Sequence, residues 1–171
     1  AERPGAQTNL GNLYAARGEA DKAVSAYIAA STIEPNYIPA YVNLADLYRS
    51  MGDETAAEKV LRQAAGSIPD NGDLHYALGL SLIRQQRMQA AVEELRLAAR
   101  LNPDNPRFIY VYAVALNSTG NPDQAIMVLQ EAHNSHPNDV DILNALIAFH
   151  RDAGNHEQAK RYTEKLSRLS R

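Results

Sequence analysis

The feature that most constrains this chain is a 34-residue period in the placement of its prolines and small residues. Prolines recur at that interval at Pro35, Pro69, Pro103 and Pro137. Two alanine series keep the same period: Ala23, Ala57, Ala91, Ala125 and Ala159, then Ala30, Ala64, Ala98 and Ala132. Members of the two series are seven residues apart, which returns to one helix face after two turns. Between them lie the large residues Tyr27, Leu61, Leu95 and Leu129. Each segment is therefore predicted to form a helix that buries a stripe of small, large and small side chains.

A fixed period of this length is typical of stacked-repeat proteins, in which each unit packs only on its neighbours. The order Leu-Gly, Tyr, Ala, large apolar, Ala and Pro at set offsets resembles the tetratricopeptide repeat (TPR). The resemblance implies an all-α fold, a right-handed superhelical solenoid of antiparallel helix pairs, with a single array over residues 1–171. The expected repeats are 4–37, 38–71, 72–105, 106–139 and 140–171. The fifth departs most from the pattern, because His150 replaces a large apolar residue and no proline closes the unit.

Glycine marks the expected turn between the two helices in every repeat except the third. The third turn reads Arg84-Gln85-Gln86-Arg87 instead. A left-handed backbone there would cost a residue with a side chain roughly 1–2 kcal/mol. We predict that Gln86 adopts this conformation, or else that the turn is built differently. In the second repeat, Asp53 is predicted to cap the helix that follows its glycine turn.

Composition and charge exclude several classes of function. The chain is 45% hydrophobic and 22% charged, as is typical of a soluble domain. Its net charge of −3 argues against nucleic-acid binding, which normally needs a basic patch. No apolar run is long enough for a membrane span, so we expect no membrane insertion. The absence of cysteine excludes disulfides and thiol catalysis and leaves the compartment open between a bacterial cytoplasm and periplasm.

The sequence carries no catalytic signature. It has no Gly-rich phosphate loop and no Gly-x-Ser-x-Gly elbow, so we expect neither enzymatic activity nor a cofactor. His133 and His136, with Glu131 nearby, have the spacing of a metal-binding pair on a helix. Zinc sites generally use three or four protein ligands, and only two would lie close here. The favoured interpretation places these histidines at a frayed helix end, without a metal.

The resemblance to TPR proteins also implies where a partner would bind. In that family the first helix of each repeat lines a concave groove, and residues at fixed offsets face the bound segment. Carried over by offset, the polar part of the groove would display Thr8, Asn9, Asn12, Asn43, Asp46 and Arg49. The remaining part would display Tyr76, Leu80, Arg84, Arg107, Tyr110, Val114, Asn144 and Arg151.

Within this groove we predict three kinds of contact. Asn9, Asn12 and Asn43 would bond the backbone of a partner. Apolar patches with charged rims tend to mark interaction sites. The predicted apolar floor is Tyr76, Leu80, Tyr110 and Val114, with the two tyrosines side by side, and the predicted rim is Arg84 and Arg107.

Two narrower functions of TPR proteins fit the sequence only in part. The carboxylate clamp of co-chaperones needs three cations that are missing here, although its two asparagines are matched by Asn12 and Asn43. The asparagine ladder of O-linked N-acetylglucosamine transferases is represented only by Asn9 and Asn43. The favoured hypothesis is a non-catalytic scaffold that binds a peptide or protein segment in the concave groove. The alternatives are a substrate-presenting arm of a larger enzyme, such as a glycosyltransferase of that kind, and self-association into a homo-oligomer.

A second resemblance concerns the origin of the chain. Residues 110–116 and 149–154 resemble the closing repeats of bacterial proteins in which such an array follows a multihaem cytochrome region. This resemblance implies the C-terminal array of a larger bacterial protein. The Cys-x-x-Cys-His haem sites of those proteins are not present in this sequence, so we expect no haem in this chain.

Overall fold

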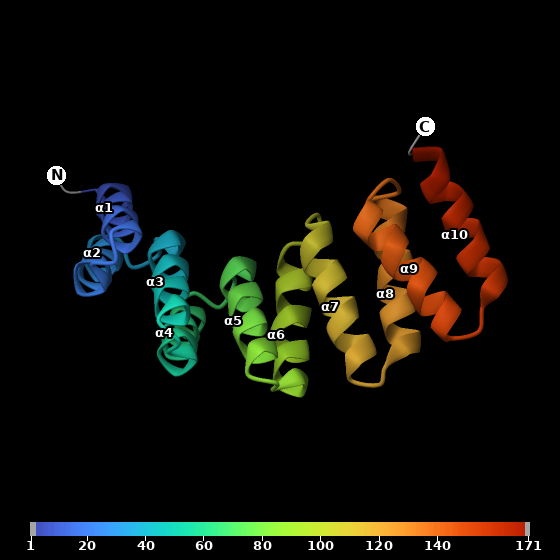
Figure 1. The fold of residues 1–171 in the computed structure, drawn as a ribbon, viewed down its shortest axis with the longest axis horizontal. Coiled ribbons are helices and arrows are strands. Elements are labelled where there is room, and N and C mark those ends of the chain that lie inside the picture. The colour runs from blue at the N-terminus through green and yellow to red at the C-terminus, as the bar shows by residue number, and fades with distance from the viewer. Residues whose placement is uncertain (1–2, 170–171) are drawn as a thin grey trace. The chain divides into compact units, whose positions relative to one another are not determined.

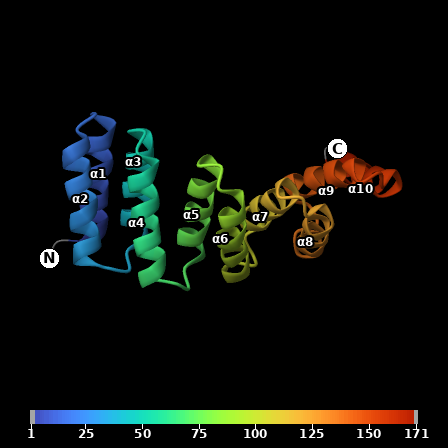
Figure 2. The same ribbon diagram turned by 90° about the horizontal axis from the view of Figure 1, so that it is seen from below.

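The computed structural model describes residues 3–169, which form ten α-helices and no strand within that range. The helices are α1 (Pro4–Ala16), α2 (Ala20–Ile33), α3 (Ile38–Ser50), α4 (Glu54–Ser67), α5 (Gly72–Arg84), α6 (Met88–Leu101), α7 (Pro106–Ser118), α8 (Pro122–Ser135), α9 (Val140–Asp152) and α10 (His156–Leu169). Figures 1 and 2 show α1 paired with α2 and α3 paired with α4 as hairpins. The predicted all-α class is confirmed.

The chain divides into two compact units, Ala1–Gln86 and Arg87–Arg171, called unit 1 and unit 2 below. Unit 1 contains α1 to α5, and unit 2 contains α6 to α10. No helix in the described residues is both long and apolar enough to cross a bilayer.

Local signals in the sequence set the helix ends. Proline occupies the first turn of α1, α3, α7 and α8. Proline has no amide hydrogen, and in the first turn an amide hydrogen would find no acceptor within the helix. The predicted cap of α4 is confirmed, since Asp53 Oδ1 accepts a hydrogen bond from the Ala56 amide at 2.8 Å. Asn71 and Asp139 cap α5 and α9 in the same way.

The turn between α5 and α6 is the one hairpin turn of the described residues that uses a left-handed residue other than glycine. Gln86 has a φ of 60°, while glycine takes positive φ in the other four turns. The prediction for Gln86 is therefore confirmed. Gln86 therefore adopts the strained left-handed backbone conformation, and the turn is not built differently.

The core of unit 1 lies between successive hairpins. Ala23 and Tyr27 of α2 pack against Leu44 and Leu47 of α3, and all four are buried. This is the predicted stripe of small and large residues, completed by the helix that follows. The residues of α1 at the offsets of Leu44 and Leu47 are exposed instead, because no further hairpin of the described residues packs on them. They are Leu10 and Leu13, 37% and 47% exposed.

Unit 2 repeats this packing until its last helix. In α6 the predicted stripe of Ala91, Leu95 and Ala98 is fully buried. In the last helix, α10, Ala159 is the only described residue that is fully buried. The fifth repeat therefore departs from the pattern in its packing as well as in its sequence.

Candidate functional site

First helices of neighbouring repeats contact one another within each unit. In unit 1, α3 contacts both α1 and α5, and in unit 2, α7 contacts α9. Residues at the same offset in successive first helices are therefore brought close together. The face formed by α1, α3 and α5 carries most of the polar residues predicted for the groove.

Asn12 of α1 and Asn43 of α3 meet on this face. Asn43 Nδ2 donates a hydrogen bond to Asn12 Oδ1 at 3.1 Å, and the Tyr27 hydroxyl donates to the same oxygen at 2.7 Å. Two donors use both lone pairs of the Asn12 carbonyl oxygen. The amide NH₂ of Asn12 and the carbonyl oxygen of Asn43 remain without a partner among the described residues, so one donor group and one acceptor group are available.

Tyr27 reaches this face because α1 has a glycine opposite its ring. A Cβ added at Gly11 would lie 2.5 Å from Tyr27 Cε1, so only glycine leaves room for the ring. Burial raises the pKa of the Tyr27 hydroxyl, and the negative charge of Asp46 raises it further. The hydroxyl therefore keeps its proton and its role as donor.

The sequence predicts Tyr27 as a large residue of the buried stripe but does not predict this hydrogen bond. The second, third and fourth repeats carry leucine at that offset, and leucine has no polar atom to reach the face. The sequence feature that could have indicated the bond is a tyrosine, Tyr27, at an offset where leucine is usual, together with Gly11 on the facing helix.

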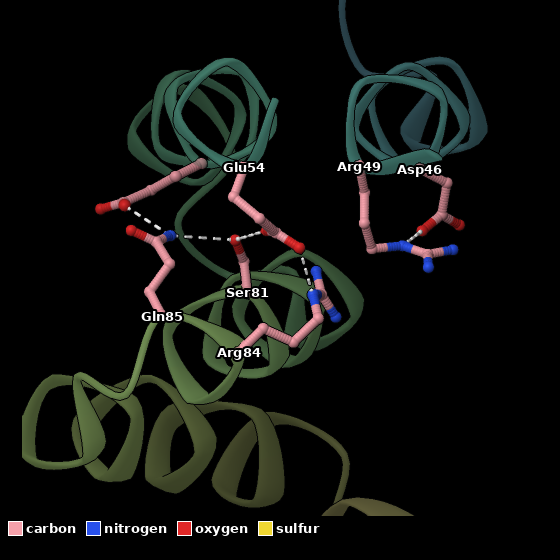
Figure 3. Close-up of polar contacts among 7 residues, drawn as sticks. Asp46, Arg49, Glu54, Ser81, Arg84 and Gln85 are labelled. Carbon is pink, nitrogen blue, oxygen red and sulfur yellow. Dashed lines mark hydrogen bonds and ion pairs between the residues drawn. The ribbon is translucent and has the colours of Figure 1, made fainter. Parts of the chain in front are cut away.

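An open pocket of about 230 Å³ lies beside the asparagine pair. It is lined by Asn12, Ala15, Tyr27, Asn43, Asp46, Leu47 and Ser50. Asp46 Oδ1 forms an ion pair with Arg49 Nε at 3.2 Å, which Figure 3 shows at the side of α3. The pocket thus offers amide and hydroxyl groups above an apolar base, and these groups suit hydrogen bonding to a peptide backbone.

Not every predicted polar residue belongs to this cluster. Asn9 is exposed on α1 but does not line the pocket. The expectation that Thr8 faces the groove is wrong, because Thr8 is buried and its hydroxyl donates to the Pro4 carbonyl oxygen at 3.0 Å. A threonine hydroxyl that bonds the backbone one turn earlier is held against its own helix.

The residues predicted as the apolar floor are half-buried. Tyr76 and Leu80 lie on α5 in unit 1, while Tyr110 and Val114 lie on α7 in unit 2. Each pair is one helical turn apart, so each forms a short apolar strip on its own helix. The side-by-side placement of the two tyrosines joins residues of different units and stays a prediction. Arg107 is exposed near the start of α7.

Arg84 belongs to a polar network between α4 and α5 (Figure 3). Its Nε donates to Glu54 Oε1 at 2.6 Å, and Glu54 Oε2 accepts from the Ser81 hydroxyl at 3.1 Å. Gln85 extends the network by donating to Ser81 at 3.3 Å and to Glu58 at 2.8 Å. A ligand carboxylate would therefore compete with Glu54 for Arg84.

His133 lies in the last turn of α8, as expected, but the expectation that this helix end is frayed is wrong. His133 is buried, because Tyr162 and Lys165 of α10 lie against it. Among residues 3–169, no three or more metal-ligating side chains are grouped so that they could hold an ion.

The hairpins and their shared face define an α-helical repeat protein. Three family models described as tetratricopeptide repeat or TPR repeat match the sequence, over residues 11–52, 42–106 and 106–149. The chain belongs to the tetratricopeptide repeat family. No match was found among curated protein sequences.

Solved structures with the same fold include several TPR proteins. A crystal structure of MamA is 21% identical with a TM-score of 0.78, and the match covers 94% of each chain. YrrB, described as a TPR protein with an unusual peptide-binding site, is 21% identical with a TM-score of 0.73, over 95% of this chain and 84% of its own. Pseudomonas aeruginosa pilF is 20% identical with a TM-score of 0.77, over 97% of this chain and 76% of its own. At these identities the likeness shows the fold, that of TPR solenoid proteins.

Proposed function

We propose that this chain is a non-catalytic scaffold that binds an extended protein segment on the face formed by its first helices. The observation that carries the proposal is the asparagine pair, in which Tyr27 and Asn43 both bond Asn12 Oδ1. This arrangement leaves the amide NH₂ group of Asn12 and the carbonyl oxygen of Asn43 available on neighbouring first helices. A peptide backbone presents the same two kinds of group.

The geometry of the pair favours a backbone over a charged ligand. The cluster of Asn12, Asn43 and Tyr27 contains no cation, and the nearby carboxylate of Asp46 would repel an anion. Arg49 is already paired with Asp46. A neutral, hydrogen-bonding segment therefore fits this part of the face best.

The rest of the proposed site is apolar. The strip of Tyr76 and Leu80 on α5 and the strip of Tyr110 and Val114 on α7 would bury side chains of the bound segment. Aromatic residues are frequent anchors at interfaces because they bury a large area with few rotatable bonds. Asn9, Arg84 and Arg107 complete the proposed site as outer contacts. The family membership supports the proposal, as does the peptide-binding site described for YrrB.

The test starts from peptides selected by display against the wild-type chain, measured singly by isothermal titration calorimetry. We expect the Asn12→Ala/Asn43→Ala variant to bind about 5- to 150-fold more weakly, since two backbone hydrogen bonds contribute roughly 0.5–1.5 kcal/mol each. Asn134→Ala is the matched control, because Asn134 is exposed on the second helix α8. It should bind like the wild type.

Equal affinity of wild type and double variant would contradict the proposal for the asparagine pair. Sedimentation of the free chain over a concentration range tests the alternative that the chain self-associates. If a dimer forms and the selected peptide does not displace it, the face is a site for a second copy instead. A strict monomer that binds the peptide supports the scaffold.

A further inference from the structure

A buried cluster of side chains joins α8, α9 and α10 within unit 2. His133 of α8 is 7% exposed and His150 of α9 is 4% exposed. The ring of Tyr162, on α10, meets His133 edge to face at a centroid distance of 5.5 Å and stacks on His150 at 5.7 Å. Because α10 fully buries only Ala159 among its described residues, this cluster supplies a large part of its packing.

The hydrogen bonds of the cluster require a neutral His133. Lys165 Nζ lies 2.6 Å from His133 Nε2, and an ammonium group can only donate. His133 Nε2 must therefore accept, which places the ring proton on Nδ1. The side-chain amide nitrogen of Gln130 lies 3.5 Å from His150 Nε2 and is also a donor. The Nδ1 atoms of both histidines are buried without a hydrogen-bond partner.

No carboxylate of the described residues compensates a charge on either ring. Tyr162 lies against both rings, and Lys165 is the charged group that acts on His133. For His150 the acting cause is burial, without a charged neighbour. A proton added to His133 Nε2 would point at the Lys165 ammonium. Protonation thus replaces a hydrogen bond with a repulsion between two cations.

Burial lowers the pKa of both histidines from the ordinary 6.5, and the charge of Lys165 lowers that of His133 further. A histidine with a lowered folded pKa stabilises the docked state when it is neutral, above pH 6.5. This stabilisation is lost as the pH falls from the ordinary pKa towards the lower value of the docked state. Acid therefore favours the state in which α10 has left the two rings.

We propose that His133, His150, Tyr162 and Lys165 form a pH-sensitive latch that holds α10 on α8 and α9 when the histidines are neutral and releases it on acidification. The released state exposes both rings to water, where they can carry charge. The latch involves no residue of the proposed partner site, so the two proposals can fail independently.

The test is hydrogen exchange by mass spectrometry at pH 7.5 and pH 5.0, corrected for intrinsic rates. Between these values the docking constant can fall by at most about 30-fold for each histidine, given an ordinary pKa of 6.5. We expect exchange in residues 156–169 to rise more than about tenfold, while exchange in α7 changes little.

The matched variant is His133→Ala/His150→Leu. It places at each position a residue that the chain already uses at the same repeat offset, Ala99 and Leu116. The variant should lose the pH response of α10, with a rise below about threefold. His156→Gln is the control, because His156 is exposed at the start of α10 and its variant should respond like the wild type.

An equal rise in wild type and double variant would overturn the latch, as would a wild-type α10 that shows no rise. If the double variant fails to fold, NMR titration of the wild-type histidine rings decides the question. The latch requires both buried rings to titrate below the ordinary histidine pKa of 6.5. Rings that titrate at or above 6.5, or that titrate without a change in the α10 amides, contradict it.

Discussion

The hydroxyl of Tyr27, a core residue only 3% exposed, donates a 2.7 Å hydrogen bond to the side chain of Asn12 on the neighbouring helix. One side chain thus takes part in both the core of the first hairpin and the candidate partner site. The packing of α2 on α1 orients an amide of the candidate partner site. Stability and binding are therefore expected to be coupled in this repeat.

Tyr27→Phe tests this coupling. The variant keeps the ring in the core and removes one hydrogen bond, so the free energy of unfolding should fall by about 0.5–1.5 kcal/mol. Affinity for a selected peptide should fall as well, because Asn12 is less firmly held. Tyr41→Phe is the control, since its hydroxyl donates to the Pro35 carbonyl oxygen at 2.8 Å, away from Asn12. Calorimetric binding that is equal in the two variants would contradict the coupling.

Gly11→Ala should destabilise the first hairpin. The new Cβ would approach Tyr27 Cε1 to 2.5 Å, and overpacking of this kind costs about 1–3 kcal/mol. Tyr27→Leu in the same chain should recover much of the loss, because it recreates the pairing of Ala45 with Leu61 in the second repeat. Urea unfolding of both single variants and the double variant measures this; strictly additive effects would show that the two sites do not compete for space.

Gln86→Gly should stabilise the chain. Its φ of 60° strains a residue with a side chain, and glycine relieves that strain at some entropic cost. We expect a net gain of about 0.5–1 kcal/mol in thermal or urea unfolding. Gln89→Gly, at an exposed position within α6, should instead lose about 1 kcal/mol. A loss in both variants would mean that the turn does not store strain.

The buried stripe of α6 gives a test of packing. Leu95 and Ala91 are both 0% exposed. Leu95→Ala should cost roughly 2–5 kcal/mol by leaving a cavity, and Ala91→Leu about 1–3 kcal/mol by overpacking. Gln89→Ala on the exposed face should change stability by less than about 0.5 kcal/mol. Unchanged melting midpoints for the two core variants would show that the faces of the helix are assigned wrongly.

Much of the fold was predictable because each position of the repeat occurs several times in the sequence, and equivalent positions have similar residue types. The burial of Ala91 and Leu95 follows from their repeat offsets, and the strained Gln86 follows from the glycines at the same point of other repeats. Local signals such as the Asp53 cap were equally clear.

The site was less predictable because its contacts depend on whether a side chain of one helix is long enough to reach a polar group on another helix. Family offsets placed Asn12 and Asn43 in the same predicted groove. They did not indicate that these two residues would bond each other, that Tyr27 would bond Asn12, or that Glu54 would pair with Arg84. The burial of His133 was not predicted for a related reason. The fifth repeat departs from the pattern, so nothing in the period indicated that α10 would cover that ring.

The most direct test of the scaffold is a ¹⁵N NMR titration of the chain with a peptide selected by display. The measurement follows the side-chain amides of Asn12, Asn43 and the control Asn134 together with the backbone amides. We expect the largest shift changes at Asn12 and Asn43 and along α1 and α3, with Asn134 unaffected. Changes confined to the second helices, with both side-chain amides of the pair unmoved, would contradict the proposed binding face.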